Sequence, residues 1–137
     1  VAKYSLANDK YYITDKCLNY LTKLDLINEK GLLRGKKGSK YKFTFEHPVP
    51  SNIIADLLYD NYDNETRLKD ILKETDIVTI LTYEENAILN KTKLTSKMPP
   101  NWQIFKNSSF ERYVSAGIEI PHKKIPVYGA LARWYYD

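Results

Sequence analysis

The 137-residue sequence predicts an α+β fold built as one domain. Apolar residues recur at spacings of three and four in some segments, as in helices, whereas other segments are short runs of aromatic and β-branched residues, as in strands. A single cysteine excludes an internal disulfide, and no apolar run approaches the roughly 18 residues that a membrane span needs. We therefore expect a cytoplasmic protein without a membrane partner.

The first predicted helix spans residues 14–27, with Thr14 as a possible N-cap. The segment GLLRGKKGSKYK follows it and combines three glycines with a run of Lys and Arg. Such a basic turn can bring backbone and positive charge close to phosphate. We expect a basic helical N-terminal piece over residues 1–40, with these nucleic-acid-binding residues: Arg34, Lys36, Lys37 and Lys40.

The stretch YKFTFEHPVP contains a predicted strand over residues 41–45, because aromatic and polar residues alternate in it. The strand ends at Glu46 and His47, and prolines then break it. Two helices are expected next, the first over residues 53–58 and the second capped by Asn64.

A second strand is predicted over residues 76–82, in the stretch DIVTILT. Thr82 and Glu85 form a capping-box pattern, so a helix should begin directly after the strand, with Asn86 in its first turns. The C-terminal extension, residues 96–137, predicts one helical piece near residues 110–116 and otherwise short extended segments. Arg112 in that piece is a further candidate for a phosphate contact.

Charge is sorted along the chain. Residues 1–45 carry a net charge of +6, residues 46–76 carry −5, and residues 77–137 carry +3. Basic flanks around an acidic middle suit a protein that attracts a polyanion and keeps carboxylates near a metal or a reacting phosphate. This pattern favours nucleic acid as the partner.

Strand, Glu46-His47, proline, helices, strand and Asn-bearing helix together resemble HNH (ββα-metal) nucleases. The resemblance covers about residues 41–89 and rests on FTFEHPVP and IVTILTYEENAIL. It implies a ββα-metal-like core over residues 41–95. It also implies that His47 is the general base and that Glu46 and Asn86 hold one divalent ion, Mg²⁺ with Mn²⁺ as the alternative.

The implied chemistry fits the residue types. A hard cation takes oxygen ligands, which a carboxylate and an amide supply, and an imidazole titrates near neutral pH, as a general base requires. The expected function is metal-dependent endonucleolytic hydrolysis of nucleic acid, DNA before RNA. The other histidine, His122, lies outside the motif and is expected to be inert.

Two other classes of protein remain open. The helix of residues 14–27 and the basic turn resemble part of a winged helix, which would bind nucleic acid without catalysis. A small interaction or inhibitor protein from a mobile genetic element is the third hypothesis, so a protein partner stays open.

Overall fold

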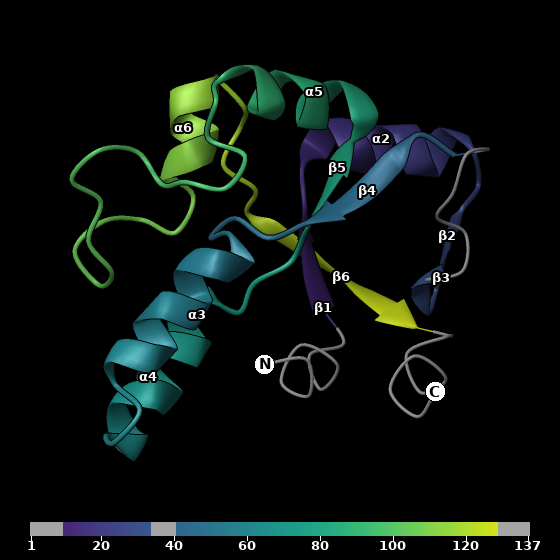
Figure 1. Ribbon diagram of the computed structural model, residues 1–137. Coiled ribbons are helices and arrows are strands. Elements are labelled where there is room, and N and C mark those ends of the chain that lie inside the picture. The colour runs from purple at the N-terminus through teal and green to yellow at the C-terminus, as the bar shows by residue number, and fades with distance from the viewer. Residues whose placement is uncertain (1–9, 34–40, 129–137) are drawn as a thin grey trace.

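A six-stranded sheet forms the centre of the computed structural model, which describes residues 10–33 and 41–128 (Figure 1). The strands are β1 (Lys10–Ile13), β2 (Ile27–Asn28), β3 (Gly31–Leu33), β4 (Phe43–Glu46), β5 (Thr79–Thr82) and β6 (Lys123–Tyr128). The helices are α2 (Asp15–Lys23), α3 (Ser51–Asp60), α4 (Glu65–Thr75), α5 (Tyr83–Lys91) and α6 (Glu111–Ala116). The predicted α+β class is confirmed. None of the described helices is long and apolar enough to cross a membrane.

The strand order is β2-β3-β6-β1-β5-β4. Strand β1 pairs in parallel with β5 and antiparallel with β6, and β4 pairs antiparallel with β5. The order strand, two helices, strand and helix expected after residue 41 is present as β4, α3, α4, β5 and α5. One sheet takes strands from all three predicted segments of the chain, so these segments do not fold as separate layers.

Two hydrophobic clusters cover opposite faces of the sheet. Neighbouring residues of a strand point to opposite faces, and Ile80 and Leu81 of β5 belong to different clusters. Ile80 packs with Cys17 and Leu21 of α2, whereas Leu81 packs with residues of α5 and α6. Helix α2 therefore covers one face, and α5 with α6 cover part of the other.

The first helix ends earlier than its apolar pattern predicts. It stops at Lys23, and Asp25 adopts a left-handed φ of 56°. The amide of Asp25 donates to the carbonyl of Thr22, and the amide of Leu26 donates to that of Leu21. These two bonds form a Schellman motif, which turns the chain into β2 and so corrects the predicted extension to residue 27.

The local signals for the later helices are confirmed. Asn64 caps α4 by accepting a hydrogen bond from the amide of Arg67. Thr82 and Glu85 form the capping box at the start of α5. Helices α3 and α4 form an antiparallel hairpin that extends away from the sheet (Figure 1).

Cys17 is fully buried against the sheet, and this burial, together with the negative charge of Glu85, raises the pKa of its thiol to about 12. Folding therefore favours the protonated thiol. The resulting stability is present below the unfolded pKa of about 8.5 and is lost as the pH rises towards 12.

We expect Cys17 to be inert to a thiol reagent at pH 8 in the native protein and to react fully in urea. We also expect the stability advantage of wild type over Cys17→Ala to shrink by about 1 to 2 kcal/mol between pH 7 and pH 10. Urea denaturation of both proteins at the two pH values measures this. An unchanged difference would contradict the burial of a protonated thiol.

Candidate functional site

Glu46 is held in an ion pair rather than in an open metal site. Its Oε2 lies 3.0 Å from an Nη1 of Arg112, and its Oε1 accepts a 2.6 Å hydrogen bond from the hydroxyl of Tyr113. Burial raises the pKa of Tyr113 well above its usual value, and the neighbouring Glu46 charge acts in the same direction. Both carboxylate oxygens are engaged and the charge is already balanced, so Glu46 does not fit the metal that the resemblance implies.

Arg112 is not available to nucleic acid, and that prediction is wrong. Its side chain is only 1% exposed. Besides Glu46, the guanidinium donates to four backbone carbonyls, those of Leu94, Thr95, His47 and Pro48. Arg112 therefore fastens α6 to the end of β4 and to the segment after α5.

Asn86 lies one turn into α5, which begins at the far end of the β4–β5 pair from Glu46. Glu46 is opposite Thr79, whereas Thr82, which precedes α5, is opposite Phe43. Three residues of strand, about 10 Å, separate these two ends. In the described part of the chain no hydrogen bond joins Asn86 to Glu46 or to His47, so the structure does not bring the three predicted residues together.

His47 is oriented by a backbone contact. Its Nδ1 lies 3.2 Å from the carbonyl oxygen of Ile77. A carbonyl only accepts, so Nδ1 carries the hydrogen and Nε2 is the basic nitrogen of the neutral ring. This tautomer suits a general base, and that role stays a prediction.

Residues 34–40 of the basic turn fall outside the described residues, and with them Arg34, Lys36, Lys37 and Lys40. The strands on either side of it are described. In a winged helix they would pair with each other, but β3 and β4 are separated in the sheet by β6, β1 and β5. The sheet therefore does not form the predicted wing.

The carboxyl ends of β1 and β5 meet at the opposite edge of the sheet from His47. The two strands are parallel, and each runs into a helix through a threonine cap, Thr14 before α2 and Thr82 before α5. The buried Glu85 accepts hydrogen bonds from both threonine hydroxyls, at 2.8 and 3.2 Å. In open α/β sheets, ligands bind at such carboxyl ends, so this edge is the natural place for a site.

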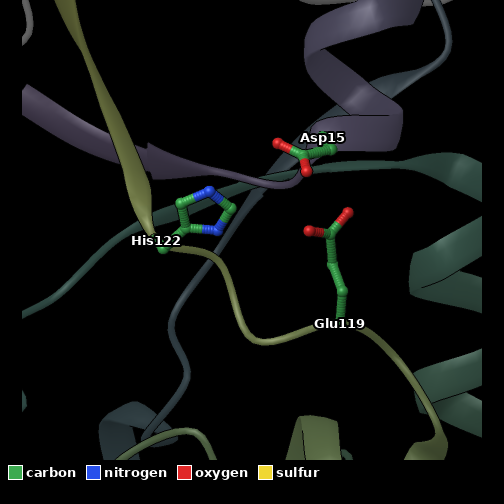
Figure 2. A group of neighbouring side chains, drawn as sticks. All are labelled: Asp15, Glu119 and His122. Atoms are coloured by element: carbon green, nitrogen blue, oxygen red, sulfur yellow. The ribbon is translucent and has the colours of Figure 1, made fainter.

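Asp15, Glu119 and His122 converge at this edge (Figure 2), with ligand atoms that all lie within 4.8 Å of one another. Asp15 is the first residue of α2, and the other two belong to the segment that leads into β6. Because β6 is antiparallel to β1, with Lys123 opposite Ile13, the start of β6 lies beside the end of β1. Glu119 and His122 are exposed, whereas Asp15 is half-buried with its Oδ1 covered, so an ion can reach the cluster from the side of Glu119 and His122.

Lysines surround the cluster. The ammonium of Lys123 lies 3.2 Å from Oδ1 of Asp15, and the backbone amide of Lys16 donates to Glu119 at 3.3 Å. The Lys16 ammonium pairs with Glu84 at 2.9 Å, and this hydrogen bond raises the pKa of Lys16. The two carboxylates and the imidazole therefore lie beside exposed cations. Lys123 balances the negative charge of Asp15, which a bound metal ion would otherwise balance.

No local pattern in the sequence indicates this cluster. Asp15 and Glu119 are 104 positions apart, and only the pairing of β1 with β6 brings them together. His122 lies outside the HNH-like motif, and a histidine in an exposed loop is expected to be inert.

Comparison with known proteins adds no relative: no family model matches the chain, and neither curated proteins nor solved structures give a match.

Proposed function

We propose that this protein binds a divalent metal ion through Asp15, Glu119 and His122 and hydrolyses phosphodiester bonds of nucleic acid at that position, DNA before RNA. The observation that carries the proposal is the convergence of three ligand atoms within 4.8 Å at the carboxyl end of β1. Two ligands on one ion at about 2.2 Å each are at most about 4.4 Å apart. Small side-chain rotations would therefore close the cluster around an ion.

The donor set favours Mn²⁺ or Zn²⁺ over Mg²⁺. Mg²⁺ prefers an all-oxygen shell with several waters, whereas an imidazole nitrogen suits transition-metal ions and Mn²⁺ also takes carboxylates. The charges of Asp15 and Glu119 would balance a divalent ion. We take Mn²⁺ as the first ion to test.

The chain would bind a phosphate group beside the ion through exposed cations. Lys16 and Lys123 are both half exposed at the cluster, and the positive end of the α2 dipole lies at Asp15. A bound ion would supply an activated water and stabilise the charge of the transition state. The net charge of +4 and the isoelectric point near 9.0 favour a polyanionic substrate.

A variant of Asp15 distinguishes the metal site proposed here from the site expected around His47. We expect Asp15→Asn to weaken Mn²⁺ binding at least about tenfold and to abolish Mn²⁺-dependent plasmid cleavage, because one anionic ligand is lost. His47→Gln should leave metal affinity unchanged, since His47 lies at the opposite sheet edge. Calorimetric titration with Mn²⁺ and a plasmid nicking assay measure the two effects.

Lys123→Met provides a matched control at the same cluster. It removes the cation that competes for Asp15, so Mn²⁺ affinity should rise while the fold is retained. If Asp15→Asn and wild type bind Mn²⁺ alike, the metal site is not at this cluster. Mn²⁺ binding without cleavage of DNA or RNA would retain the metal site and contradict the nuclease activity.

A further inference from the structure

An open groove of about 790 Å³ runs between the α3–α4 hairpin and the loop of residues 97–106. Its apolar lining includes Ile53 and Leu57 of α3 and Trp102 and Ile104 of the loop, all half-buried. The volume lies in the range of ligand-binding pockets. The groove lies away from the Asp15 cluster, among elements that the proposed hydrolysis does not use.

The groove is held open by contacts between its walls. The side-chain amide of Asn52 on α3 donates to the carbonyl of Ser96 at 3.0 Å. Arg67 of α4 stacks on the ring of Phe105 with its guanidinium carbon 4.5 Å from the ring centre. Within the loop, the indole of Trp102 donates to the carbonyl of Ser108 at 2.9 Å. A partner would thus meet a preformed surface, which lowers the entropy cost of binding.

The loop also carries strained backbone. Phe105 adopts a left-handed φ of 70°, a conformation that large side chains rarely take. Strained backbone lowers stability and persists only where the surrounding structure stabilises it. Such residues are concentrated at binding and catalytic sites. Here it places the Phe105 ring under Arg67.

Opposite charges rim the groove. Asp56 and Asp60 stand on the α3 side, and Arg67, Lys97 and Lys106 stand on the α4 and loop side. All five are exposed, and none of them belongs to an ion pair within the described residues. The two aspartates are four residues apart, so their carboxylates are one helical turn apart.

We propose that this groove binds an amphipathic helix of a partner protein. The partner helix would lay an apolar stripe on Ile53, Leu57 and Trp102, with basic residues one turn apart facing Asp56 and Asp60. Its acidic residues would face Arg67, Lys97 and Lys106. This is the helix-in-groove mode of recognition, in which apolar anchors supply affinity and rim charges fix the direction of the helix.

The probe is a synthetic amphipathic peptide of about five helical turns, or 18 residues. It carries a leucine stripe, lysines along one flank and glutamates along the other. Binding is followed by the fluorescence of Trp102 in the full chain with Trp134→Phe, which removes the second tryptophan. We expect a saturable change in that fluorescence.

Charge reversal makes the test specific. We expect Asp56→Lys with Asp60→Lys to weaken peptide binding at least about fivefold, since two rim attractions become repulsions. A peptide with glutamates in place of the lysines should recover most of this loss. Asp63→Lys with Asp70→Lys makes the same change of charge on the hairpin outside the groove and should alter affinity less than about twofold.

Three outcomes would overturn the proposal: no saturable binding, equal effects of the groove reversal and the Asp63 and Asp70 reversal, or a dimer in sedimentation whose second copy excludes the peptide. Circular dichroism of each variant checks that it is folded. Metal binding at Asp15 is measured on the same variants and should not change, so the groove and the proposed hydrolysis can fail separately.

Discussion

Arg112→Met is expected to lower the free energy of unfolding by about 3 to 5 kcal/mol. The substitution leaves Glu46, with its side chain 16% exposed, as an almost buried carboxylate without its cation. It also removes the hydrogen-bond donors to four backbone carbonyls. Two of these carbonyls directly follow β4, and the other two lie in the segment after α5. Urea denaturation monitored by circular dichroism at pH 7 measures the loss.

A double variant distinguishes the lost ion pair from the lost packing. Glu46→Leu with Arg112→Met leaves no isolated charge, so it should be more stable than Arg112→Met alone. The backbone carbonyls still lack their donor, and recovery should therefore be partial. A single Arg112→Met variant within 1 kcal/mol of wild type would contradict the role of Arg112 as the fastening of α6.

Glu85→Ala is expected to lower the free energy of unfolding by about 2 to 4 kcal/mol. Its Oε1 accepts hydrogen bonds from the hydroxyls of Thr14 and Thr82 and from the amide of Thr82. Removing it leaves buried donors without an acceptor at the starts of both α2 and α5. Because Asp15 follows Thr14 directly, the same change should also weaken Mn²⁺ binding while the protein remains folded.

Glu84→Ala is the matched control for Glu85→Ala. Glu84 is the neighbouring acid, but it is exposed, and within residues 10–33 and 41–128 its one ion pair is with the exposed Lys16. Its removal should cost less than about 1 kcal/mol. Thermal denaturation and Mn²⁺ titration of the two variants compare them, and equal losses would mean that Glu85 does not join the two helix caps.

Local signals in the sequence predicted much of the secondary structure. Asn64 and the Thr82–Glu85 pair act within three residues of their partners, so their capping patterns were readable directly. The end of α2 could not be predicted in this way, because the apolar spacing of the helix continues past Lys23. The reversal there depends on the left-handed Asp25, a residue type that is not specific to that conformation.

The site expected around Glu46 failed for a different reason. An acid beside a histidine at a strand end looks the same whether the acid is open to a metal or paired with a buried arginine. Arg112 is 66 positions away in the sequence, and the position of α6 in the fold brings it to Glu46. No local pattern could have indicated that the Glu46 charge is already balanced.

The sequence by itself determined the α+β class, the helix caps and the basic character of the chain, because these follow from composition and from contacts within a turn. The tertiary structure decided the strand order, the partner of Glu46, the meeting of Asp15 with Glu119 and His122, and the groove beside α3. These features depend on which strands pair although they are distant in sequence. The neighbours of β1 in the sheet decide which side chains lie together at the end of that strand. The residues of the candidate site are therefore brought together by the pairing of β6 with β1, which no local sequence pattern indicates.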